Sequence, residues 1–134
     1  MKWMLDTDTC IAIIKAKPAS VLKKLRGKSV GQVGISSITL GELAFGAAKS
    51  SRRDEARAAL AEFLLPLEIA SFDSEAAASY GQLRASLEKR GMPIGPLDTL
   101  IGGHAVALDV ILVTHNTREF NRADTLRLED WTSS

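Results

Sequence analysis

The chain has 134 residues, of which 46% are hydrophobic and 25% are charged, and this is the size and composition of one ordinary globular domain. Its 17 basic and 16 acidic residues leave a formal net charge of +1, which argues against a surface that is cationic all round and wraps long nucleic acid. A single cysteine excludes both an intrachain disulfide and a cysteine-cluster zinc site. The apolar runs are too short to span a bilayer, and Asp6 interrupts the N-terminal one, so we expect a cytoplasmic protein with no membrane association.

Short apolar runs alternate with amphipathic stretches along the chain. In the first half the pattern predicts, in order, a strand at 3–5, a helix begun by Thr7 or Asp8 and stopped by Pro18, a short helix around 21–25 stopped by Gly27, a strand at 33–36, and a helix begun by Ser37 or Thr39 that runs through 47. In the second half it predicts a helix at 52–65, a brief strand at 67–70, a helix from 74 to Gly91, a helix at 96–108, a strand at 110–113, a helical turn at 118–120 and a last strand near 126–128.

Strands that are compact apolar runs and alternate with helices are typical of a parallel sheet covered on both faces. The sequence contains no repeat, linker or low-complexity tract. We therefore expect a single α/β domain over residues 1–134 with a central, mainly parallel sheet. In such sheets ligands bind beyond the carboxyl ends of the strands.

Acidic and amide side chains fall at these strand ends and at the helix starts that follow them. Asp6 ends the first predicted strand, Glu42 lies in the first turns of the helix after 33–36, and Asp98 lies in the first turn of the helix at 96–108. Thr114 and Asn116 follow the strand at 110–113. Carboxylates brought together at one sheet edge repel unless a cation compensates, and all-oxygen donors suit Mg²⁺ or Mn²⁺. Such ions activate water and clamp a scissile phosphate.

Each of these acids also has a purely structural explanation. Asp6 can be a helix cap, and the helix macrodipole favours Asp98 in a first turn without any metal. An isolated Glu42 on a helix is ordinarily solvated. Spacing alone leaves these alternatives open. The same holds for three further residues: Asp8 can be a helix cap, His115 a structural loop residue and Glu119 a surface acid.

At these residues the sequence resembles the VapC toxins of the PIN-domain family, and the resemblance runs over essentially the whole chain. The segments that carry it are MLDTDTCI at 4–11, ISSITLGEL at 35–43, GPLDTLIGGHA at 95–105, VTHNTREF at 113–120 and the ending LEDW at 128–131. The resemblance implies a three-layer α/β/α PIN fold and a metal-dependent endoribonuclease that cleaves structured RNA, in several members tRNA. It also implies inhibition by a VapB-like antitoxin and a homodimeric toxin.

The family's acids match Asp6, Glu42 and Asp98 by position. The resemblance implies that Asp6 and Asp98 are the direct ligands of Mg²⁺, or alternatively of Mn²⁺. It implies that Glu42 orients a metal-bound water or contacts a second ion. The fourth acidic position of many PIN domains falls near Asn116, which is an amide here. This departure puts a second metal in question unless Glu119 supplies the charge.

The resemblance and the chain order together define the expected site. We expect catalysis by Asp6, Glu42, Asp98 and Glu119. We expect substrate contacts from Arg118, which adjoins the cluster, and from Thr114 and Asn116. The helices around 40–48 and 56–65 are expected at the dimer and antitoxin surfaces, although such apolar stripes are ordinarily core.

Three other functions fit parts of the pattern. A catalytically inactive PIN-like binding module would lack the acids, and all three principal ones are present. A phosphoacceptor receiver domain needs an acid at the end of a central strand, where this chain has Ser36 and Ser37. A phosphatase with the same metal would hydrolyse generic phosphate esters, whereas a ribonuclease should need a particular RNA.

Overall fold

The computed structural model describes residues 1–132 as strands and helices in alternation. The strands are β1 (Trp3–Leu5), β2 (Val33–Ser36), β3 (Glu68–Ala70), β4 (Ile111–Val113) and β5 (Leu128–Glu129). The helices are α1 (Thr7–Lys15), α2 (Ala19–Arg26), α3 (Ser37–Ala48), α4 (Arg53–Leu64), α5 (Ser74–Lys89), α6 (Pro96–Leu108) and α7 (Thr117–Phe120). Over these described residues, no helix has both the length and the apolar character needed to cross a bilayer.

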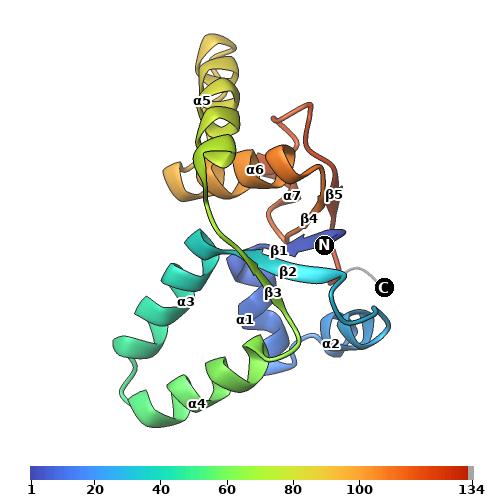
Figure 1. Cartoon of the computed structure of the whole chain (residues 1–134), viewed down its shortest axis with the longest axis vertical. Coiled ribbons are helices and arrows are strands. Elements are labelled where there is room, and N and C mark those ends of the chain that lie inside the picture. The colour runs from blue at the N-terminus through green and yellow to red at the C-terminus, as the bar shows by residue number, and fades with distance from the viewer. Residues whose placement is uncertain (133–134) are drawn as a thin grey trace.

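The five strands form one sheet in the order β3-β2-β1-β4-β5, and each neighbouring pair is parallel. The central strand β1 pairs Trp3 with Val33 on one side and with Ile111 on the other. Because all the strands run the same way, their carboxyl ends lie along one edge, from which α1 and α3 start (Figure 1). The predicted parallel α/β sheet is confirmed.

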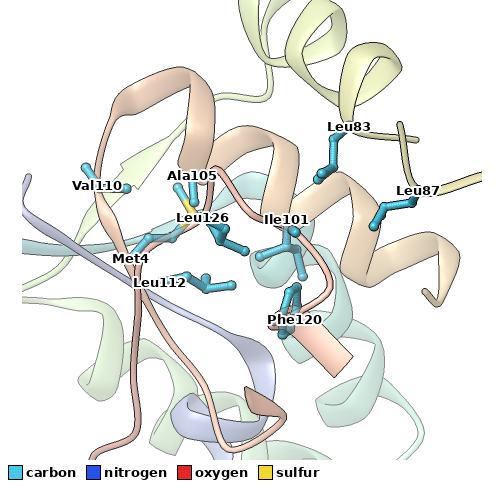
Figure 2. Packing of buried hydrophobic residues seen from close by; sticks show 10 residues of the cluster. Met4, Leu83, Leu87, Ile101, Ala105, Val110, Leu112, Phe120 and Leu126 are labelled. Atoms are coloured by element: carbon cyan, nitrogen blue, oxygen red, sulfur yellow. The ribbon is translucent and has the colours of Figure 1, made fainter. Parts of the chain in front are cut away.

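The two faces of the sheet bury separate apolar clusters, because successive strand residues point to opposite faces. Met4 and Leu112 pack with Leu83 of α5 and Ile101 of α6, as Figure 2 shows. On the other face, Leu5 belongs to a cluster that α1, α2 and α3 complete, with α4 packed against it. Figure 1 shows α5 and α6 on one side of the sheet and α1 to α4 on the other. The predicted three-layer α/β/α architecture is therefore confirmed.

Helix α6 packs closely against α5 at Gly103. A Cβ atom at this position would lie 2.6 Å from the Cα atom of Tyr80, so any side chain would push the two helices apart. The close approach fixes α6 over the sheet. Since Asp98 lies in the first turn of α6, the same packing fixes the height of this acid above the sheet edge.

Helices α1 and α3 begin at Thr7 and Ser37, as predicted, and each is capped by the residue before its start. The cap of α1 is Asp6, the structural alternative that the sequence left open, and not Thr7 or Asp8; the cap of α3 is Ser36. Asp6 directly follows the last residue of β1, and Ser36 is itself the last residue of β2. Their extended backbone and short polar side chain let one residue finish a strand and begin a helix. The last strand lies at 128–129, two residues later than predicted.

Candidate functional site

Asp6 stands at the carboxyl end of the central strand and is only 4% exposed. Its Oδ1 accepts a hydrogen bond of 2.8 Å from the backbone N–H of Thr7, which starts α1. Its Oδ2 accepts one of 2.8 Å from the hydroxyl of Thr114, which directly follows the neighbouring strand β4. Two donors from two different elements therefore set the orientation of this carboxylate.

Asp6 and Asp98 lie in a cluster of negative charge. Burial raises the pKa of Asp6 to about 7, and the charges of Asp8 and Asp98 push it in the same direction against hydrogen bonds from Thr114 and Thr7. Burial also raises the pKa of Asp98 to about 6, and the carboxylates of Glu119, Glu42 and Asp8 add to this effect. A nearby cation stabilises the ionised form of carboxylates that hinder one another's ionisation. The structure thus brings the three predicted acids, Asp6, Glu42 and Asp98, to one sheet edge. Glu119 and Asp8 join them there, because their charges also act on Asp98.

Glu42 reaches the cluster from α3. Its Oε1 accepts a hydrogen bond of 2.7 Å from the hydroxyl of Thr7, the first residue of α1. Thr7 therefore serves two acids, because its backbone N–H binds Asp6 and its hydroxyl binds Glu42. This bridge holds α3 against the start of α1.

Glu119 and Asn116 form the opposite wall of the site. The Asn116 amide donates to Glu119 Oε2 at 2.9 Å, and Glu119 Oε1 accepts a bond of 2.9 Å from the backbone N–H of Gly95, which caps α6. These two bonds lower the pKa of Glu119. The Asn116 side chain also hydrogen-bonds the Asp98 carboxylate and opposes the rise of its pKa. Asn116 and Glu119, joined by a hydrogen bond, therefore occupy together the place expected for the fourth acid of the site.

Asp8 belongs to the cluster, although the sequence favoured a cap for it. Its Oδ2 accepts a hydrogen bond of 3.1 Å from the backbone N–H of His115, and its charge raises the pKa of both Asp6 and Asp98. The available signal was the pair of acids two residues apart at a strand end. The Nε2 atom of His115 is buried without a hydrogen-bond partner among the described residues.

The three predicted substrate contacts occupy different environments. Thr114 is fully buried, and its hydroxyl donates to Asp6 and accepts from the backbone N–H of Asn116. Asn116 is half-buried between Asp98 and Glu119. Arg118 is exposed on α7, beside the Asn116–Glu119 wall. Of the three, Arg118 is the one whose side chain is open to solvent.

The donor set of the cluster suits a hard divalent cation. Over residues 1–132, no three histidine, cysteine, aspartate or glutamate side chains are grouped so that they could hold a metal ion by themselves. The cluster offers oxygen donors only, from carboxylates whose charges disfavour one another. Mg²⁺ keeps several waters and takes one or two direct carboxylates, so a partial all-oxygen set of this kind fits it.

The architecture is that of a PIN domain, and the model of the family described as PIN domain matches residues 3–126. The chain is 45% identical over 131 residues to the tRNA(fMet)-specific endonuclease VapC of Shigella flexneri, which covers 98% of each protein. It is 40% identical over 132 residues to Ribonuclease VapC2 of Rickettsia felis, again with 98% of each covered. A crystal structure of DNA-bound VapBC from Salmonella typhimurium matches with a TM-score of 0.93 at 43% identity and 98% coverage of both chains. The chain belongs to the VapC family of PIN-domain ribonucleases, as the resemblance predicted.

Proposed function

We propose that this protein is a Mg²⁺-dependent endoribonuclease toxin that cleaves a structured RNA, with tRNA as the substrate class. Mn²⁺ is the alternative ion. The observation that supports this best is that Asp6 and Asp98, two carboxylates from different elements, lie at one sheet edge where burial first and the charges of neighbouring carboxylates second raise both of their pKa values. PIN-domain nucleases generally use divalent metal ions. The relative at 45% identity is named for tRNA(fMet), which is the reason for choosing tRNA.

In this proposal Asp6 and Asp98 are the direct metal ligands. When bound, the ion supplies an acidified water and neutralises charge on the scissile phosphate. Thr7 and Thr114 each engage one oxygen of Asp6 and leave further lone pairs of that carboxylate for the ion. Glu42, steadied by the Thr7 hydroxyl, accepts hydrogen bonds from water at the site.

Glu119 acts in this proposal chiefly by holding its neighbours. Both of its oxygens are engaged, by the Gly95 N–H and by the Asn116 amide, and Asn116 in turn contacts Asp98. Glu119 therefore supplies the negative charge that the fourth position lacks and fixes the start of α6. Arg118 is left free to contact an RNA phosphate, which positions the substrate without reading its sequence.

We also propose that the whole chain works as one PIN domain, as a homodimer, in the cytoplasm and under the control of a VapB-like antitoxin. An apolar groove of about 500 Å³ lies between α1, α2 and α4, with Ile14, Leu25 and Phe63 in its lining. On α3, Phe45 is 65% exposed. These surfaces include the helices around 40–48 and 56–65 that the resemblance assigned to protein partners. The related complexes are described as VapBC.

The test is cleavage of a total tRNA pool by purified protein freed of antitoxin, with Mg²⁺, with Mn²⁺ or with EDTA. The comparison is Asp6→Asn, and the matched control is Asp54→Asn, the same chemical change at an exposed position on α4. We expect discrete fragments that need the metal, that vanish in Asp6→Asn and that persist in Asp54→Asn. Folded wild-type protein that cleaves no RNA with any metal would support the inactive binding module instead.

A further inference from the structure

The loop that leads into α6 is held by two arginines. This loop, residues 90–95, joins α5 to α6, and its first four residues are exposed. At its start, the Arg90 guanidinium donates a hydrogen bond to the backbone oxygen of Arg122, just after α7. In its middle, the Arg122 guanidinium donates one of 2.9 Å to the backbone oxygen of Pro93. The two arginines, called here the loop clamp, therefore bind the loop and the segment after α7 to each other in both directions.

The clamped loop ends at the helical turn that carries Asp98. The Gly95 N–H donates to Glu119, and the Gly95 backbone oxygen accepts a hydrogen bond of 2.8 Å from the Thr99 hydroxyl and one of 2.9 Å from the Thr99 N–H. The Asp98 carboxylate lies against Gly95, because a Cβ atom there would be 3.5 Å from Asp98 Oδ2. Pro93 is two residues before Gly95, so a shift of the loop at the clamp moves the start of α6 and with it this carboxylate.

The charge of Arg122 also reaches the site. Hydrogen bonds from Asn116 and from the Gly95 N–H lower the pKa of Glu119, and the charge of Arg122 lowers it further against the effect of burial. A positive charge near the acids repels a metal ion, so its removal by itself would strengthen metal binding. The loss of a contact that holds Asp98 in place would weaken metal binding. The sign of the change therefore separates an effect of charge from an effect of position.

The loop clamp lies on the surface of the protein. Arg90 pairs with Asp124 at 3.4 Å, and the two side chains are 36% and 81% exposed. Arg122 is exposed as well. Exposed ion pairs contribute little to global stability. The effect of the clamp should therefore appear at Asp98, to which the loop leads, and hardly at all in the Tm of the protein.

We propose that Arg122, assisted by Arg90, is a positioning residue of the metal site, which holds the loop at 90–95 so that Asp98 keeps its place relative to Asp6. This proposal rests on the proposed ribonuclease function, because that function makes Asp98 a metal ligand. Removal of a residue that orients a metal ligand typically lowers metal affinity by about 10- to 100-fold. Arg122 acts through the backbone of the loop, so we expect the lower end of this range.

The test measures Mn²⁺ binding by calorimetry, without RNA, in wild type, Arg122→Ala and Arg127→Ala. Arg127 is the matched control, because this exposed arginine donates a hydrogen bond of 2.7 Å to the backbone oxygen of Asp109, which caps the other end of α6. We expect Mn²⁺ binding about tenfold weaker in Arg122→Ala and unchanged in Arg127→Ala. Arg122→Lys keeps the charge and a donor for the Pro93 carbonyl, so it should recover part of the affinity. The Tm of each variant should stay close to that of wild type.

A second measurement needs no metal. Hydrogen exchange of the Gly95 N–H in EDTA, followed by NMR, reports how often the end of the loop opens. The exchange should be faster in Arg122→Ala than in wild type and unchanged in Arg127→Ala. Unchanged or tighter Mn²⁺ binding by Arg122→Ala, or an unchanged Gly95 exchange rate, would overturn the proposed role of the clamp. Wild-type protein that binds no Mn²⁺ and cleaves no RNA would instead defeat the proposed function, and the Gly95 exchange rate would still decide whether Arg122 holds the loop.

Discussion

The backbone N–H of Gly95 donates a hydrogen bond of 2.9 Å to Glu119 Oε1, so a side chain of α7 holds the residue that caps α6. The two residues are 24 positions apart. Asp98 lies in the first turn of α6, and Asn116 links its carboxylate to the same glutamate. The placement of Asp98 therefore depends on α7 as well as on its own helix.

Removal of this support should weaken catalysis without removing a metal ligand. We expect Glu119→Ala to lower tRNA cleavage on the order of 10- to 100-fold, the range typical of residues that orient metal ligands. Glu119→Gln keeps an acceptor for Gly95 and should lose less than Glu119→Ala, yet more than His115→Ala. The measurement is the cleavage rate over a Mg²⁺ titration. A larger loss in His115→Ala would point to acid–base work by the histidine.

Asp98→Asn should abolish cleavage while the fold stays intact. The amide has nearly the volume of the carboxylate, and the site is already crowded with negative charge that hinders Asp98 ionisation. We expect an unchanged circular dichroism spectrum together with the loss of metal-dependent fragments. Asp54→Asn, on exposed α4, is the control for the chemical change itself. Wild-type cleavage by Asp98→Asn would rule out the acid cluster as the catalytic centre.

The raised pKa of Asp6 predicts how the stability of the metal-free protein depends on pH. The folded-state pKa of about 7 lies above the unfolded value of 3.8, so the folded protein holds this proton more tightly. The resulting stabilisation is fully present below about pH 4 and is lost as pH rises through 7. At about 1.4 kcal/mol for each pKa unit, the loss for Asp6 amounts to a few kcal/mol.

Asp6→Asn should remove most of this dependence. In EDTA the wild-type Tm should fall between pH 5 and pH 8 by an amount on the order of 10 °C more than the Tm of the variant. Mg²⁺ at pH 8 should raise the wild-type Tm and leave that of the variant nearly unchanged. If Tm depended on pH equally in the two proteins, the surroundings of Asp6 would not raise its pKa in the folded state.

The sequence could predict those site residues that lie at the boundary between a strand or loop and the helix that follows. Asp6 and Asp98 stand at element boundaries, and parallel topology brings such boundaries to one edge. The partners of Glu119 and Asp8 could not be predicted, because they are backbone N–H groups of Gly95 and His115 that only tertiary packing places. The Ser36 cap was not predicted, because this residue both ends a strand and caps the helix that follows. Apolar periodicity shows where a helix runs better than where it begins.

A buried polar link also joins the two helices that carry Glu42 and Asp98. The Nδ1 atom of His104 on α6 lies 2.8 Å from the hydroxyl of Ser36, which caps α3, and both residues are at most 1% exposed. Burial lowers the pKa of His104, and the Nδ1 atom of its neutral ring can accept a hydrogen bond from the serine hydroxyl. His104→Leu leaves the hydroxyl without this partner and should lower the free energy of unfolding by about 1–3 kcal/mol.

His104→Asn is the discriminating variant, because an asparagine side chain can place a polar atom near the position of Nδ1. It should recover part of the stability that His104→Leu loses. Ser36→Ala should cost about 1 kcal/mol as a lost helix cap. Because Ser36 and His104 share one bond, the double variant Ser36→Ala/His104→Leu should lose less than the two single losses combined when unfolding in urea is measured. Additive losses would mean that the two side chains act independently and that the link does not join α3 to α6.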